Sequence, residues 1–447
     1  MKASIIASPR ALTHGISLLT LAVILNLLRP YPRFIPESLA FHLGGRLFDF
    51  MVIALCVISL AWRRQVLLPV PVRRPMAALL VIFLFHALLL LTWGVAVRGY
   101  ALGVRDLYEP LRLLIVALVM VAALNDHRLG DPRFWRRFWI GAILLFAVVV
   151  VIRVTQPPLL FTLTDLFMGA SKDKFVLERA IVRQTGFFVN PNWAGVFLTW
   201  GLAYFLFHFS WRRPSAYFFV LLTGLLIVVT GSRTALVSTA VVVGFWLLRG
   251  AKLAQWAVGL GAAAVLIGAM IWNLEGLLSI LPSHQRELVR AVAEGRSMTD
   301  VSSLSVRVEV WKVAMEGQFW KAPLLGHGSF KSSVVDVVDN QYIKWLVWYG
   351  VAGVAMLLAF YVYFPLLALT AVRRSGPAER QFADSVLASL VAVLVASIAG
   401  AMFDVTQLGF LLAMMYGAAL NMGWRAGGLS SAHGLGPNRP RHAGKPA

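Results

Sequence analysis

The chain alternates long apolar runs with short polar segments. A transmembrane helix needs about 20 mostly apolar residues, and runs of this kind predict about twelve spans. The runs cover residues 11–29, 43–62, 76–96, 106–125, 135–153, 192–209, 215–230, 234–249, 254–273, 345–371, 382–402 and 404–423. We therefore expect an all-α polytopic membrane protein, with spans 1–9 within residues 1–273 and spans 10–12 within 345–423.

Two of the polar segments are long enough to carry structure of their own. One covers about 154–191 and the other covers 274–344, between spans 9 and 10. Long loops without structure are uncommon unless they have a function. The second loop has apolar side chains at helical spacing, which predicts helices lying over the membrane-embedded core. These side chains are Leu304, Val308, Trp311 and Met315.

The composition excludes a soluble protein. Of the 447 residues, 59% are hydrophobic and only 14% are charged, whereas soluble domains are about a quarter charged. The polar residues could not cover the surface, so the bilayer must solvate most of it. The single cysteine, Cys56, can form no intrachain disulfide and has no thiol partner for a metal. Residues 11–29 lack a clear signal-peptide cleavage site, so we expect a retained first span.

Basic residues are distributed unequally between the two sets of loops. The net charge is +21, and membrane proteins concentrate Lys and Arg on the cytoplasmic side. This explains the charge without nucleic acid as a partner. With an even number of spans, both termini are cytoplasmic and the arginine-rich loops share that side. The tail, 424–447, is rich in Gly, Pro, Ser and His, so we expect it to be disordered and cytoplasmic. The main basic residues on that side are Arg63, Arg64, Arg73, Arg74, Arg128, Arg133, Arg136, Arg137, Arg212, Arg213, Arg249, Lys252, Arg373, Arg374, Arg380 and Arg425.

Polar residues at the opposite, outer ends of the spans are the candidates for function. A charge at membrane depth costs roughly 2.5–3.5 kcal/mol. Structural alternatives remain open for each candidate: a helix cap for the Asn residues and Asp339, a snorkelling anchor for Arg233, and a solvated helix face for Arg307. The candidates are Arg183 with Asn190 and Asn192, Arg233, Arg307, and Asp339 with Asn340 and Tyr342.

A further polar group lies at the start of the fourth span. It consists of Arg105, Asp106, Glu109 and Arg112, whose spacing allows them to pair with one another on one helix.

Arginine side chains recognise phosphate groups through two parallel hydrogen bonds. Several arginines on one side of the membrane therefore indicate a lipid-linked phosphate or pyrophosphate. The sequence has no Walker A segment and no Asp-x-Asp pair, so nothing indicates a nucleotide.

In the order and spacing of five segments, the sequence resembles the O-antigen ligase and O-antigen polymerase superfamily of bacterial envelope enzymes. The segments are residues 183–192, residues 232–236, Arg307 with Trp311, residues 323–328, and Asp339-Asn340 with Gly350 and Gly353. The resemblance implies a metal-independent, inverting glycosyltransferase of the GT-C type, without a cofactor. It also implies an undecaprenyl-pyrophosphate-linked glycan as donor and a glycan or lipid A–core as acceptor. Such an enzyme lies in the inner membrane with its active site facing the periplasm.

The resemblance further implies roles for individual residues. Arg233 and Arg307 would stabilise the pyrophosphate leaving group, and Asp339 would be the general base. The remaining candidates would bind substrate: Arg183, Asn190, Asn192, Asn340, Tyr342, Lys331 and Arg105.

Two questions of function stay open at this point. Ligases of this family usually carry a His where this chain has Asp339, which favours a polymerase that joins repeat units. Ligation to lipid A–core is the alternative within the family. A transporter or flippase for an anionic lipid-linked substrate is the alternative of another class, although no internal repeat is evident.

Overall fold

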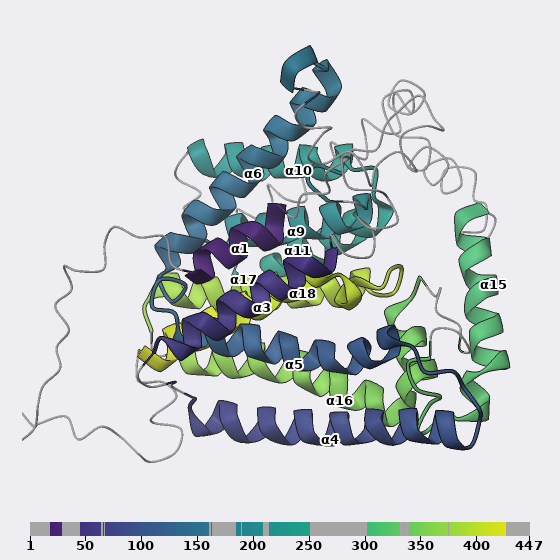
Figure 1. Cartoon of the computed structure of the whole chain (residues 1–447). Coiled ribbons are helices and arrows are strands. Elements are labelled where there is room, and N and C mark those ends of the chain that lie inside the picture. Colours follow the sequence, from purple (N-terminus) through teal and green to yellow (C-terminus); the bar gives the residue numbers. More distant parts are fainter. Residues whose placement is uncertain are drawn as a thin grey trace, which may run out of the picture.

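The computed structural model describes residues 18–28, 45–63, 66, 68–160, 162, 185–188, 190–208, 214–250, 302–330, 334, 339–373 and 375–425. Within these ranges the regular secondary structure is entirely helical (Figure 1). Every expected span that falls inside them is a helix; the expected span 254–273 and residues 426–447 lie outside. The α-helices are α1 (Leu18–Leu28), α3 (Gly45–Ala61), α4 (Val70–Ala96), α5 (Val104–Asn125), α6 (Pro132–Thr155), α9 (Pro191–His208), α10 (Pro214–Val229), α11 (Arg233–Gly250), α15 (Ser302–Gly317), α16 (Gln341–Val372), α17 (Pro377–Ala396) and α18 (Thr406–Arg425).

Within the described ranges, four helices are long and apolar enough to cross a membrane. They are Val70–Ala96, Asp106–Asn125, Pro132–Thr155 and Gln341–Val372, and shorter apolar helices occur in α1, α3 and α10. Large apolar side chains on α4 and α10 point away from the protein: Phe85 is 67% exposed and Leu221 is 71% exposed. Contiguous apolar surface of this kind is unfavourable in water and is typical of helices that face lipid. The protein is therefore a helical membrane protein.

Two helices, α9 and α18, form the centre of the bundle. The α18 side chains are buried from Gln407 to Gly423, where the helix packs against α5 and α16. Helix α9 is enclosed by α11 and α17. Amide side chains join α18 to its neighbours: Asn421 Nδ2 donates to Leu124 O at 2.5 Å, and Asn26 Nδ2 donates to Gln407 O at 2.9 Å. Such interhelical hydrogen bonds replace the hydrophobic driving force that is missing between helices in lipid.

The helix expected in the long late loop is present as α15, which lies across one end of the bundle (Figure 1). We call this the α15 end. The start of α16 lies there beside the connection between α17 and α18, because Gln341 N donates to Ser397 O at 2.8 Å. Ser329 Oγ donates to Asp106 O at 2.8 Å and so adds the start of α5.

The opposite end of the bundle carries the arginine-rich segments. There Arg249, at the end of α11, contacts Asp384, near the start of α17, at 2.7 Å. Arg63 lies 3.8 Å from Asp126, which follows α5. Among the residues that the structure describes, Arg63 and Arg249, which the sequence assigned to one side of the membrane, therefore lie at this end of the bundle.

Candidate functional site

Helix α16 is broken near the α15 end, at Gly350. This residue has φ 63° and ψ −173°, which no helix can accommodate. The loop that contains Pro323–Gly328 meets the backbone groups at the break. Val351 N donates to Pro323 O at 2.9 Å, and Gly328 N donates to Trp348 O at 2.7 Å. Because lipid offers no hydrogen bonds, a break at this depth needs protein partners of this kind.

Glycine is required on both sides of this contact. A Cβ atom on Gly350 would lie 2.3 Å from Leu324 O, and one on Gly326 would lie 2.5 Å from Gly350 N. Both residues also have positive φ, which side chains other than glycine rarely adopt. Two segments on which the family resemblance rests, residues 323–328 and Gly350, are thus a single structural unit.

The structure brings together two of the three predicted catalytic residues. Arg307, on α15, lies with Nε 3.5 Å from Asp339 Oδ2, immediately before α16. The two side chains are 28% and 61% exposed, so the pair is open to solvent. Helix α15 and the last residues of the same loop thus place a guanidinium and a carboxylate at one point of the α15 end.

The cap of α16 is Asn340, not Asp339. Asn340 Oδ1 accepts hydrogen bonds from Tyr342 N at 3.0 Å and from Ile343 N at 3.1 Å, which satisfies the first amides of the helix. The Tyr342 hydroxyl donates to Leu394 O, on α17, at 2.7 Å. Asn340 and Tyr342 therefore fix the start of α16, and the Asp339 carboxylate takes no part in capping.

Asn190 and Asn192 hold a second group of segments together. Asn190 Oδ1 accepts from Asn192 N at 2.8 Å at the start of α9. Asn192 Oδ1 accepts from Ser232 Oγ at 2.8 Å. Ser232 directly precedes Arg233, the half-buried first residue of α11. The capping alternative describes Asn190, while Asn192 joins the start of α9 to the turn that carries Arg233.

Three predicted substrate-binding residues cannot be placed. Arg183 and Lys331 lie outside the described residues, and the side chain of Arg105 lies outside them as well.

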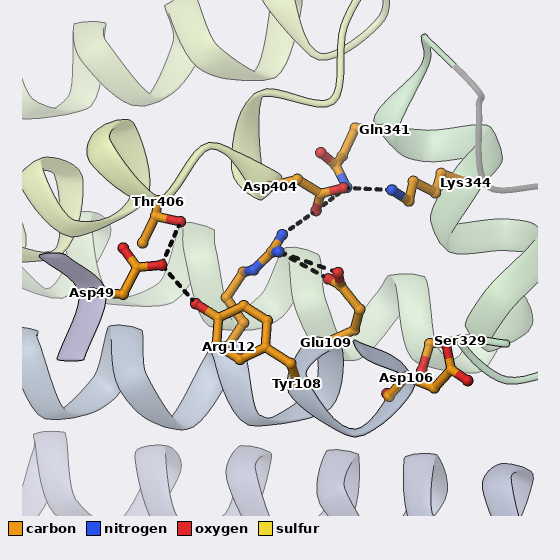
Figure 2. A network of polar contacts seen from close by, with 10 residues as sticks. All are labelled: Asp49, Asp106, Tyr108, Glu109, Arg112, Ser329, Gln341, Lys344, Asp404 and Thr406. Atoms are coloured by element: carbon orange, nitrogen blue, oxygen red, sulfur yellow. Dashed lines mark hydrogen bonds and ion pairs between the residues drawn. The ribbon is translucent and has the colours of Figure 1, made fainter. Parts of the chain in front are cut away.

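A buried network of charges lies beside the break in α16, and the sequence predicted it only in part (Figure 2). Arg112 Nη2 lies 3.1 Å from Glu109 Oε2, which confirms the expected pairing within α5. Arg112 Nη1 also lies 2.8 Å from Asp404 Oδ1, and Lys344 Nζ lies 2.8 Å from Asp404 Oδ2. Asp404, between two apolar runs, marks only a span boundary in the sequence, yet it joins α5, α16 and the α17–α18 connection.

This network holds helices together and is not a site for the substrate. Two acidic and two basic side chains balance each other, so the group has no excess charge for a diphosphate. The cavity beside it, lined by Glu109, Arg112, Asp404 and aromatic rings, measures about 30 Å³. That volume has room for only about two or three water molecules. Neither a sugar nor a phosphate group fits there.

His327, within the loop that meets the break, is held in its neutral form. Its Nδ1 lies 2.5 Å from Arg98 Nη1, and its Nε2 lies 2.8 Å from Gln318 O. A guanidinium only donates and a carbonyl only accepts, so Nδ1 must be the acceptor and Nε2 must carry the hydrogen. Burial lowers the pKa of His327 and outweighs the hydrogen bond to Gln318 O, which raises it, while the positive charges of Arg98 and Lys321 lower it further.

Among the residues that the structure describes, no three His, Cys, Asp or Glu side chains are grouped so that they could hold a metal ion.

These features define a helical membrane protein with a broken helix and a helical loop across one end. The O-antigen ligase family model matches residues 218–358, about a third of the chain. The match confirms the resemblance to the O-antigen ligase and O-antigen polymerase superfamily and includes Arg233, Arg307, Asp339 and the unit around Gly350. No curated protein matches the sequence. The matched family indicates a function of the ligase or polymerase type, on lipid-linked glycan and an acceptor.

Proposed function

We propose that the protein transfers a glycan from an undecaprenyl-pyrophosphate donor to an acceptor hydroxyl at the α15 end. In this proposal about twelve spans cross the bacterial inner membrane, both termini are cytoplasmic, and the α15 end faces the periplasm. The arginine-rich segments at the opposite end support this orientation, because Lys and Arg concentrate on the cytoplasmic side.

The contact between Arg307 and Asp339 carries the proposal. It brings a group suited to phosphate next to a group that can accept a proton, and both are accessible. An exposed ion pair contributes only about 0.2–1 kcal/mol. The diphosphate of a donor, with more negative charge than one carboxylate, can therefore displace Asp339 from Arg307. Donor binding would then leave the carboxylate available as a base.

The reaction follows from these two roles. Asp339 takes the proton of the acceptor hydroxyl while the oxygen attacks the anomeric carbon. The bond from that carbon to the pyrophosphate oxygen breaks, and undecaprenyl pyrophosphate leaves with the bonding electron pair. Attack opposite the leaving group inverts the configuration. Arg307, with Arg233 and Arg183, stabilises the negative charge that develops on the leaving oxygen, and no metal is needed.

We further propose that the acceptor is another glycan, so that the enzyme polymerises O-antigen or exopolysaccharide repeat units. The carboxylate at position 339 supports this choice, because ligases of the resembling family usually carry a histidine there. A strain that lacks the gene separates the two reactions on a gel of surface polysaccharide. Single repeat units on lipid A–core would indicate a polymerase, whereas unmodified core with polymer still made would indicate a ligase.

The transfer itself is tested by returning variants to that strain. Arg233→Ala and Arg307→Ala should abolish the surface polysaccharide while the protein is still inserted in the membrane at its normal level. Lys312→Ala is the matched control, since Lys312 is an exposed basic residue on the same helix as Arg307. Normal polysaccharide with both arginine variants would contradict the proposed diphosphate site.

A further inference from the structure

A second concave site lies at the opposite end of the bundle, away from the proposed transfer site. It is a groove of about 450 Å³ between the end of α11, the end of α16 and the start of α17. Its volume is fifteen times that of the cavity at the buried network, about 30 Å³. The groove is therefore large enough to accept a chemical group rather than a few water molecules.

The lining of the groove has an excess of positive charge. Arg249, Arg373 and Arg380 line it, with Asp384 as the acidic member. Asp384 Oδ1 lies 2.7 Å from Arg249 Nε and so compensates one of the three guanidinium groups. Arg380 is oriented by its Nε, which donates to Ser375 O at 3.1 Å, so the terminal N–H groups of its guanidinium can serve a ligand. Arg373 and Arg380 are both exposed.

The rest of the lining is mostly apolar and runs along the exposed side of the end of α16. Leu366 and Leu369 line it together with Leu387 from α17, and Leu366 is 46% exposed. Leu366 and Arg373 are separated by two turns of helix, which corresponds to about 10 Å along the axis. The arginine side chains thus lie at one end of the groove, and leucine side chains line it over about 10 Å. This spacing matches the depth of the boundary between lipid headgroups and acyl chains.

We propose that this groove binds an anionic phospholipid, with its phosphate between Arg373 and Arg380 and an acyl chain along Leu366 and Leu369. Guanidinium groups bind phosphate oxygens through paired hydrogen bonds, and basic pockets between membrane helices recognise anionic headgroups. A zwitterionic lipid carries its own positive charge, so it gains less from the two arginines. The inference is independent of glycan transfer, which takes place at the other end of the bundle.

The test is a lipid titration of the purified full-length protein in detergent, followed by native mass spectrometry. The wild type should bind phosphatidylglycerol roughly 30-fold more tightly than phosphatidylcholine, since each arginine near a headgroup contributes about a factor of five. Arg373→Gln with Arg380→Gln should remove most of this preference. Arg133→Gln with Arg137→Gln, two exposed arginines of α6 at the same end, should keep it.

Three results would overturn the proposal. The first is an equal preference in the groove variant and the wild type, and the second is an equal loss in the α6 control. The third is a disulfide between Leu369→Cys and a cysteine placed within 254–273, which would show that the chain itself fills the groove. If the double variant fails to fold, Leu366→Trp, which occupies the groove and keeps both charges, should still reduce phosphatidylglycerol binding. Unchanged binding in that variant would also count against the site.

The same titration in Arg307→Ala keeps this inference separate from the proposed transfer reaction. Lipid preference should persist in that variant, because Arg307 lies at the α15 end. If a variant loses glycan transfer and keeps lipid binding, only the transfer site is affected. If it loses lipid binding and keeps glycan transfer, only the groove is affected.

Discussion

Two sets of ion pairs lie near the start of α16, and they differ in how far water reaches them. In the Arg112–Asp404–Lys344 network, the side chains of Arg112 and Lys344 are 14% and 9% exposed, and each positive charge has an acidic partner. In the pair of Arg307 with Asp339, the carboxylate is 61% exposed. A buried, compensated network is costly to open, which suits it to hold helices in place. An exposed pair exchanges partners at little cost, so it can serve a substrate.

The sharpest way to separate the two sets is to change the carboxylate of the exposed pair. Asp339→Asn should lower the rate of glycan transfer by about 10²- to 10⁴-fold, because it removes the general base. The melting temperature should change only slightly, since Asn340 supplies the cap of α16 and the exposed ion pair contributes only about 0.2–1 kcal/mol. Asp339→Glu, which keeps the carboxylate, should retain more activity than Asp339→Asn. An in vitro assay of undecaprenyl pyrophosphate release would measure both, and a near-normal rate in Asp339→Asn would show that this carboxylate is not the base.

Removal of the buried carboxylate should act on stability instead. Asp404→Ala leaves Arg112 and Lys344 without their shared partner and should cost about 3–5 kcal/mol. Asp384→Ala is the control, because its partner Arg249 is 40% exposed, and it should cost about 1 kcal/mol or less. Thermal unfolding in detergent measures both variants. Equal shifts of the melting temperature would remove the distinction between buried and exposed pairs.

Helix α16 contains Lys344 of the buried network and begins next to Asp339 of the exposed pair. A methyl group at its break should disturb the local structure. Gly350→Ala forces a side chain into a positive φ and against Leu324 O, at a cost of about 1–3 kcal/mol. Gly141→Ala should be neutral or slightly stabilising, since Gly141 lies within α6 and a Cβ there would meet no atom within 4 Å. If both variants had the same melting temperature, the close contact between the loop and the break would be wrong.

The smallest expected effect is a pH dependence of the protein's stability that is caused by His327. Its pKa is lowered in the folded protein, so the unfolded chain binds more protons between that pKa and about 6.5. The contribution of His327 to the free energy of unfolding should therefore be fully present above pH 6.5 and should be lost as the pH decreases through that window. The other histidines titrate in wild type and in His327→Gln alike, so the difference between the two melting curves isolates this residue. An identical loss between pH 7.5 and 5.5 in both proteins would contradict the neutral imidazole.

The helices could be predicted because their signal is local. Each apolar run is long enough to specify its own helix, and the spacing around Trp311 indicated α15 before any partner was known. The break at Gly350 could not be predicted in this way, because a glycine inside an apolar run fits an unbroken span. The break depends on carbonyl groups of Pro323 and Leu324, which come from another segment.

Site residues could be predicted only where a charged side chain was unusual for its place in the sequence. Arg307 and Asp339 are charges in a loop at the membrane boundary, and the structure places them in contact. Asp404 carries an equally conspicuous charge, but its partner Arg112 lies almost three hundred positions earlier in the chain. No local pattern could connect these two residues, and only the packing of α5 beside α18 does so.

The affinity of the purified protein for undecaprenyl diphosphate tests the central claim most directly. If Arg307 holds the diphosphate, Arg307→Ala should weaken binding by about 10- to 150-fold, the value of one hydrogen bond between charged groups. Lys312→Ala, from the same helix, should bind like the wild type. An affinity in Arg307→Ala equal to that of the wild type would contradict the assignment of the α15 end as the site of transfer.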